Sequence, residues 1–406
     1  MKKNIRKTGS ILVTLAFVTF VAMWLTIIPA GCGGECDGGI SARAQIEEGK
    51  AWLTRGDGDR ARLYFLEALE LDPGNPDGLY GMALSDTLHV VDVLSILVDY
   101  ILSLIESGGP VKDREEPPSW VDDLLETLLN TLLFDRTYEL EEYSGKAREI
   151  PGITFDAESI PILIAFDPVA TLSGEFDETD LLASESLTLL LRGFLLHALV
   201  LELDFDLASA WMISEIDFDT LPPEEAAAEV VRLLLAIVAD PDYPDFLTMS
   251  SEGVDTYREA GMAVGDGFDR FISVFESIRN ETDDQDDDII GYTDLNGNGG
   301  FDTGEPFFIP HFGELDEREM AVLDALVETA GDLRDAYWDR TAKDTDPYSP
   351  NPFRLSSLNP VLEAYGLPPL FPGWIKVDIG IWYAEPSPRR IRNSLILILY
   401  LLSVFL

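Results

Sequence analysis

The chain has 406 residues, 46% of them hydrophobic, so it is long and apolar enough to bury a core in more than one domain. Its 74 acidic and 28 basic residues give a formal net charge of −46. Such a surface repels phosphates, which excludes nucleic acid as a partner. It suits bound cations, basic partners or a saline medium.

The first residues predict export. A basic segment, MKKNIRK, precedes an uncharged apolar run over residues 11–28, and Ala30 and Gly31 then lead to Cys32. This pattern resembles the signal peptide of bacterial lipoproteins, in which the cysteine accepts the lipid. It departs from that family at Pro29, where an aliphatic residue is usual. The resemblance implies a signal peptide over 1–31, lipidation of Cys32 and a tether over 32–41, with an uncleaved membrane helix as the alternative.

The residues after Cys32 bear on location. Gly33 and Gly34 stand where an aspartate would retain a lipoprotein at the inner membrane, so the resemblance implies an outer membrane position, facing the periplasm or the cell surface. The chain has two cysteines, Cys32 and Cys36, so we expect no disulfide in the exported body.

Residues 44–73 predict two antiparallel helices separated by a turn at 56–59. Small and aromatic residues occupy the packing positions of the two helices: Gly49, Trp52, Ala61, Phe65 and Ala68. This spacing, closed by Pro73, resembles one tetratricopeptide repeat (TPR). It departs at Gln45, where an apolar residue is expected and Ile46 can substitute. One repeat cannot bury its own apolar face, so we expect the hairpin to pack on the next helices of the chain and to offer a partner groove near Trp52 and Tyr80.

The next predicted helix carries a polar stripe. Six polar residues recur at steps of three or four along an otherwise apolar segment: His89, Asp92, Ser95, Asp99, Ser103 and Glu106. The simplest interpretation is a solvent-facing edge of a buried helix, and the alternative is the polar lining of a ligand pocket. The candidate ligand- or partner-binding residues are therefore Trp52, Tyr80, His89, Asp92, Ser95 and Asp99.

Helical periodicity dominates the rest of the chain. We predict helices over 117–134, 177–203, 221–242, 253–280 and 315–340, with irregular segments near 149–176, 282–314 and 343–373. Arg192 and His197 mark 177–203 as a core helix and not a membrane span. Residues 374–384 alternate and favour a strand. The apolar run 395–406 is short for a bilayer span, which favours a buried final helix or strand over a membrane-touching tail.

The strongest local motif is DLNGNGGFDTGE, residues 294–305. Oxygen donors fall at positions 1, 3, 5, 7, 9 and 12 of this stretch, namely Asp294, Asn296, Asn298, the Gly300 carbonyl, Asp302 and Glu305. The spacing resembles the EF-hand calcium loop, in which a glycine at position 6, here Gly299, permits the sharp turn. The resemblance implies that these six residues bind Ca²⁺. The alternative is an Asn/Gly-rich turn without an ion.

The flanks of the motif differ from the EF-hand family. Gly291 precedes it and Pro306 follows it directly, so we expect no flanking helix pair, and a structural staple in place of a sensor. Nine acidic residues and no lysine or arginine lie between 281 and 305, and they repel one another unless cations neutralise them. Phe301 is expected to pin the loop to a core.

The sequence therefore predicts a mainly α protein. A TPR-like hairpin and helix over 42–110 would pack on a helical body over 111–281. An acidic calcium-loop segment over 282–314 and a C-terminal helix with an irregular tail over 315–406 complete the chain.

The G-x-S-x-G, Walker, H-E-x-x-H and C-x-x-C motifs are missing, so we expect no enzyme. The expected function is an exported, lipid-anchored scaffold that binds an unidentified protein partner at the cell envelope. The alternative is a ligand-binding accessory lipoprotein of an envelope uptake system, with the polar stripe lining its pocket. A deep pocket lined by Asp92 and Asp99 would favour the ligand-binding alternative.

Overall fold

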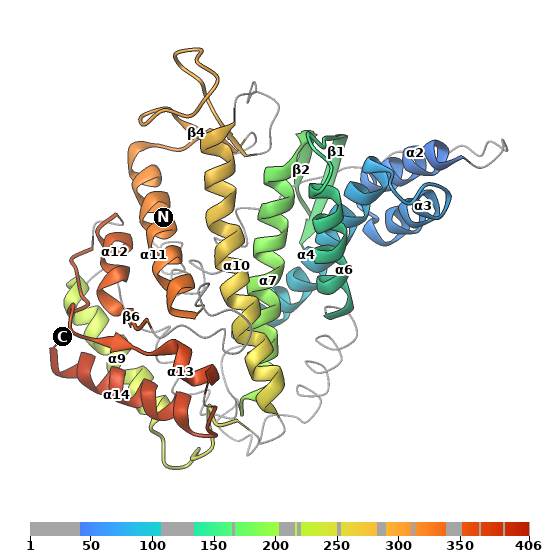
Figure 1. Cartoon of the computed structure of the whole chain (residues 1–406). Coiled ribbons are helices and arrows are strands. Elements are labelled where there is room, and N and C mark those ends of the chain that lie inside the picture. Colours follow the sequence, from blue (N-terminus) through green and yellow to red (C-terminus); the bar gives the residue numbers. More distant parts are fainter. Residues whose placement is uncertain are drawn as a thin grey trace.

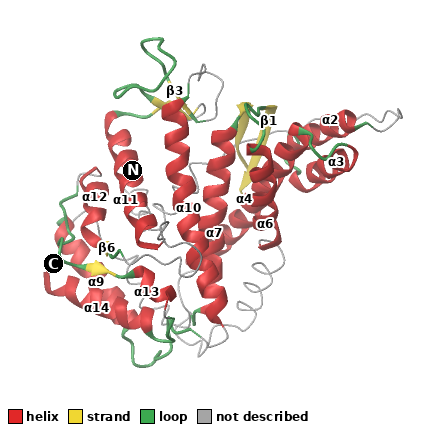
Figure 2. Ribbon diagram, in the orientation of Figure 1, coloured by secondary structure: helices red, strands yellow, loops and turns green. Residues whose placement is uncertain are grey.

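A computed structural model gives the fold. It describes residues 41–106, 134–164, 167–202, 216, 221–249, 253–281, 290–309, 313–337, 351–364, 367–384 and 386–405. The protein is mainly α-helical, as predicted, and also contains small antiparallel sheets (Figure 2). Cys32 and nearly all of the helix predicted over 117–134 lie outside the described residues. In the described part, no helix has the length and apolarity that a bilayer crossing needs.

The two helices predicted over 44–73 are present as α2 (Ala42–Leu53) and α3 (Gly58–Leu71), followed by the long α4 (Pro76–Glu106). Side chains cap the first two: Ser41 Oγ accepts from the Ala44 amide, and Asp57 Oδ1 from the Arg60 amide. Phe65 fills the seam between them and is fully buried.

The Phe65 ring dictates a glycine on both neighbouring helices. A Cβ at Gly49 would lie 2.8 Å from the ring, and one at Gly81 2.4 Å from it. Ile46 is buried, as the substitution for Gln45 requires, and Gln45 itself donates to Glu67. The small residues therefore set how closely the three helices approach.

Two long helices, α7 (Glu178–Val200) and α10 (Val254–Asn280), lie side by side at the centre of the molecule (Figure 1). Their contact is close because glycines face the partner helix. A Cβ at Gly193 would lie 2.9 Å from the Ala260 carbonyl oxygen, and one at Gly267 2.7 Å from Leu190 Cγ. A capping box of Asp177 and Asp180 begins α7.

The helix α6 (Phe134–Arg148) packs on both α4 and α7, and a buried ion triad supports this layer. Glu185 of α7 accepts from Arg148 Nε and Nη2 at 2.9 and 2.8 Å, and from Arg270 Nε of α10 at 2.7 Å. Burial raises the pKa of Glu185, and the two guanidinium groups oppose that shift.

Residues 149–176 are not irregular, contrary to the prediction. They contain an antiparallel hairpin of β1 (Phe155–Ile164) and β2 (Asp167–Phe176), with Phe155 opposite Phe176. The register shifts between Ala157 and Ile160, and this irregularity, together with two prolines in the strands, hid the pattern in the sequence. The hairpin shares one hydrophobic core with α2, α3, α4 and the start of α7, so the N-terminal unit does not form a separate core.

After α10, the chain forms a three-stranded sheet of β3 (Gly291–Tyr292), β4 (Phe307–Ile309) and β5 (Gly313–Glu314), which leads into α11 (Glu317–Tyr337). The α11 helix packs on α10. Beyond it lie β6 (Phe353–Arg354), η5 (Leu355–Leu358) and α12 (Asn359–Ala364).

The end of the chain is helical. The strand predicted over 374–384 is short, because β7 (Lys376–Val377) gives way to α13 (Ile379–Ala384), where Asp378 Oδ1 accepts from the Ile381 amide. The apolar run forms α14 (Arg390–Phe405), which packs on α9 (Pro223–Val238). Arg392 is buried and donates to the Val238 and Asp240 carbonyls. This arginine of α14 therefore contacts the end of α9 and the residues that follow it.

Candidate functional site

The loop 294–305 connects β3 to β4 and extends past the end of α10 (Figure 1). Gly297 and Gly299 have φ values of +70° and +74°, which other residues rarely adopt. These turns aim successive amides at Asp294. Its Oδ1 accepts from residues 296, 297 and 298, and its Oδ2 accepts from the Gly299 amide at 2.7 Å. These hydrogen bonds, led by that of Gly299, lower the pKa of Asp294.

The other predicted ligands join the same loop. Asn296 Nδ2 and Asn298 Nδ2 each donate to Asp302 Oδ2 at 2.6 Å. Glu305 Oε1 accepts from the Leu295 amide at 2.9 Å, and Oε2 accepts from the Asp302 amide at 2.7 Å. The side chains at positions 1, 3, 5, 9 and 12 therefore all form hydrogen bonds with groups of the loop itself.

The charge of this loop is not balanced internally. Glu305 is only 5% exposed. Within the described ranges, none of Asp294, Asp302 and Glu305 forms an ion pair with a basic side chain. Burying the Glu305 carboxylate without a basic partner is unfavourable, and in this loop only amide hydrogen bonds oppose that cost.

The residues present fit a hard cation, because carboxylate, amide and carbonyl oxygens are the ligands that Ca²⁺ takes. No set of three His, Cys, Asp or Glu side chains in the described part could hold a metal by itself. An ion here would therefore also need oxygens from Asn296, Asn298 and Gly300.

The flanks of the loop agree with the prediction. Two short strands border it in place of a helix pair, with Gly291 opposite Phe308, and Thr293 N donates to Pro306 O at 2.9 Å. The Phe301 ring contacts Tyr292 edge-on at 5.5 Å between centroids and Phe307 at 5.0 Å. Phe301 thus pins the loop to a core, as expected.

The first residues of the polar stripe face other helices. His89 has a side chain 14% exposed, and its Nδ1 lies 3.2 Å from Asp59 Oδ1 on α3. Asp59 also pairs with Arg136 of α6 at 2.8 Å. The hydrogen bond from His89 lowers the pKa of Asp59, whereas burial raises the pKa of Asp92 to about 7. Ser95 and Asp99 lie in α4, but their side chains are outside the described part.

Asp86 is a charged residue that the sequence prediction missed. It is fully buried and accepts from Arg62 Nε at 2.9 Å and from Arg136 Nη1 at 2.8 Å. Burial nevertheless raises its pKa to about 6. Asp86 stands three residues before His89, so extending the stripe by one step would have found it.

The predicted partner groove near Trp52 and Tyr80 is not formed by these two residues. The prediction that Tyr80 contributes to a partner-binding surface is wrong. Tyr80 is buried: its ring stacks on Phe155 at 5.2 Å, and its hydroxyl donates to the Asp177 carbonyl at 2.7 Å. The β1–β2 hairpin, which the sequence did not predict, covers it. Trp52 stays half-buried at the surface.

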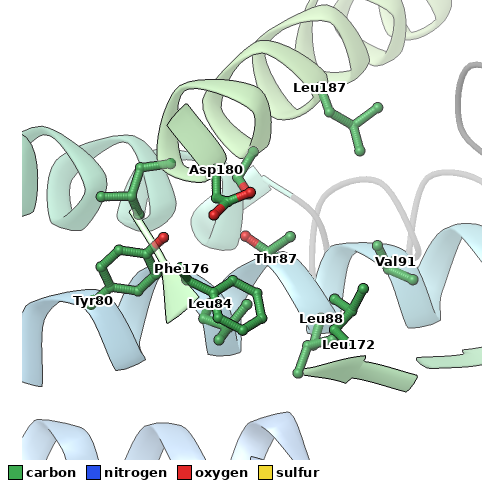
Figure 3. A pocket seen from close by; sticks show the side chains of 11 residues that line it. Tyr80, Leu84, Thr87, Leu88, Val91, Leu172, Phe176, Asp180 and Leu187 are labelled. Carbon is green, nitrogen blue, oxygen red and sulfur yellow. The ribbon is translucent and has the colours of Figure 1, made fainter. Parts of the chain in front are cut away.

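A small apolar cavity lies between α4, β2 and α7 (Figure 3). Its volume of about 20 Å³ holds roughly one water molecule. Tyr80, Leu84, Phe176 and Leu187 line it, with Asp180 at its edge, whereas Asp92 does not. This cavity is too small for a ligand and does not involve the stripe.

No protein-family model matches the chain, and no curated protein or solved structure does so either. The resemblances noted in the sequence are confined to short motifs. The function must therefore be argued from this chain's own residues.

Proposed function

We propose that this protein is an exported, non-enzymatic helical scaffold, anchored to the envelope by a lipid on Cys32, and that a structural Ca²⁺ stabilises its loop 294–305. One observation carries the calcium part. Glu305 is buried in a loop of three carboxylates that form no ion pair in the described residues. An external cation would supply the missing charge.

The ion would be held by Asp294, Asn296, Asn298, the Gly300 carbonyl, Asp302 and Glu305. Its chemistry here is charge neutralisation and cross-linking of a turn. Exported modules bind calcium at about 10⁻⁴–10⁻³ M, which matches calcium levels outside the cytoplasm. Two short strands flank the loop and leave no helix pair to open, which favours a staple over a sensor.

The N-terminal hairpin supports the scaffold part. It lies at one end of the molecule (Figure 1), and the outer face of α3 exposes Leu63 at 59% and Leu71 at 53%. Glu67 and Glu70 stand on the same face. Apolar side chains among acidic ones suit a basic partner with apolar contact residues.

Terbium luminescence tests the calcium site. Tb³⁺ takes the same oxygen ligands as Ca²⁺. Burial, together with the carboxylates of Asp294 and Glu305, raises the pKa of Tyr292. The Tyr292 phenol also contacts Phe301 of the loop, so it is near enough to sensitise Tb³⁺ there. We expect calcium to displace the signal and Glu305→Gln to remove it. Glu314→Gln, which deletes an exposed charge in the neighbouring β5, is the matched control. Equal loss in both variants would show charge attraction without a specific site.

Cross-linking in intact cells tests the scaffold part. Leu63→Ser and Leu71→Ser should reduce cross-links made from α3, whereas Leu397→Ser on the exposed side of α14 should not.

Cys32→Ser should release the protein from the membrane and abolish labelling by fatty acid. Unchanged membrane attachment of Cys32→Ser would exclude the lipid anchor.

A further inference from the structure

The aromatic core beneath the loop reaches two long helices. Phe301 stands between two proposed ligand positions, Gly300 and Asp302, and its ring contacts Phe307. Phe307 in turn contacts Phe275 of α10 at 6.1 Å between centroids. The Tyr292 hydroxyl donates at 3.2 Å to the carbonyl of Glu281, the residue that follows α10. The loop is therefore joined to the end of α10 by side chains and not only by the chain.

The first half of α11 closes the same core. The Leu315 amide donates to the Phe307 carbonyl at 2.8 Å, directly before the helix begins. Asp316 Oδ1 then accepts from the amides of Arg318 and Glu319 at 2.8 and 2.9 Å. Apolar residues of this stretch pack against Val274, Phe275, Ile278, Tyr292 and Phe307; these residues are Leu315, Met320, Leu323 and Val327.

The second half of α11 has a different support. Ala336 is buried in another cluster, and Leu333 and Tyr337 pack against it beside Tyr257 and Tyr383. Arg334 Nη1 also lies 3.5 Å from Asp269 Oδ1 of α10. The two halves of one helix are thus held by separate cores, and the loop contributes to the first alone.

We propose that calcium in the loop controls the docking of the first half of α11, residues 317–327, on α10; this rests on the calcium site proposed above. The bound ion fixes the ligand positions on either side of Phe301, which holds the ring against Tyr292 and Phe307. Without the ion the ligand positions on either side of Phe301 are no longer cross-linked, and the ring is held less firmly in the core under residues 317–327. The second half of α11 stays packed in either state.

Hydrogen exchange of the full chain, followed by mass spectrometry, tests this coupling. At free calcium about ten times Kd, opening of the dependent segment should be suppressed about tenfold. We expect exchange to slow by that factor over 291–309 and 317–327, relative to chelator at matched ionic strength. Exchange over 333–337 should not change, and that segment is the internal control.

Two variants separate the ion from the ring. Phe301→Ala keeps every proposed ligand, so Tb³⁺ should still bind while calcium no longer slows exchange over 317–327. Phe301→Leu, which preserves more of the packing, should retain part of the effect. Unchanged exchange over 254–270 of α10 identifies variants that remain folded.

Each result decides between the two proposals. Calcium binding with protection confined to 294–305 overturns the coupling and leaves the site. Absence of Tb³⁺ and calcium binding overturns both. Equal slowing over 317–327 and 333–337 also overturns the coupling, because the ion would then stabilise the whole helix.

Discussion

The N-terminal helices and the loop 294–305 are both rich in carboxylates, but these carboxylates have different kinds of partner. Among the N-terminal helices, Arg62 of α3 and Arg136 of α6 both donate to Asp86 of α4, and Arg136 also donates to Asp59 of α3. In the loop, backbone and side-chain amides donate hydrogen bonds to the carboxylates of Asp294, Asp302 and Glu305. The difference shows that carboxylates of one acidic chain can be compensated by arginines from distant helices or by amides of their own loop; a calcium ion would add to the second arrangement only if the proposed site is correct.

The largest effect should come from removing an internal counter-charge. Arg136→Met leaves Asp86 buried with one guanidinium partner and Asp59 with His89. Breaking a buried pair typically costs about 3–5 kcal/mol. Urea denaturation should show that loss, and calcium should not restore it. Arg232→Met, which breaks an exposed pair with Glu229, should leave the midpoint unchanged. An equal urea midpoint for the two variants would mean that the ion pairs of Asp86 with Arg62 and Arg136 do not stabilise the fold.

The two regions should respond oppositely to pH. The folded-state pKa of Asp86 is raised to about 6, above an unfolded value of about 3.9. Its contribution is therefore fully present below pH ~4 and is lost as pH rises to about 6, on the order of 2–3 kcal/mol. The pKa of Asp294 is lowered, so its contribution is present above its unfolded pKa and is lost in acid.

Unfolding at several pH values checks the sign. Asp86→Asn should reduce the decline between pH 4 and 6, and the remainder should come from Asp92 and Glu185, whose pKa values are also raised by burial. Asp294→Asn should reduce the loss at lower pH. An unchanged profile for Asp86→Asn would show that this carboxyl is not the titrating group.

Calcium removal should have a smaller effect. At millimolar calcium and a Kd of about 10⁻⁴–10⁻³ M, binding contributes roughly 0.4–1.4 kcal/mol. Chelation should lower the melting temperature by a few degrees at most. Magnesium should substitute poorly, because it needs a tighter octahedron and holds its waters. If sodium chloride at matched ionic strength restores the melting temperature equally, screening of the acidic cluster explains the effect and the site is wrong.

The smallest effect should come from the outer face of α3. Leu63→Ser removes an exposed side chain without a role in the core, so stability should change by no more than about 0.5 kcal/mol. Thermal melting should coincide with that of the unaltered protein. A clear destabilisation would place Leu63 in a packed contact and remove the argument for a free partner surface.

The sequence allowed local features to be predicted. The hairpin helices follow from small and aromatic residues at fixed spacing, and the loop follows from donors spaced along twelve residues. The remainder depends on distant partners. Arg62 and Arg136 lie 24 and 50 residues from Asp86, so the polar stripe can indicate Asp86 itself but not the arginines that pair with it. The burial of Tyr80 depends on a strand pair that is difficult to predict, because Pro161 and Pro168 lie within its strands.

The first turn of α7 brings the two compared regions into contact. Leu181 belongs to the hairpin core, whereas its neighbours Leu182 and Ala183 belong to the core beneath the loop. The capping box at Asp177 fixes this turn, and Tyr80 donates to the carbonyl of the same residue. Three consecutive residues of one helix therefore pack into two different hydrophobic cores. A rotation of that turn that packs one core more tightly would withdraw a side chain from the other core. Substitutions in one region therefore leave the other region unchanged only as long as the capping box keeps this turn in place.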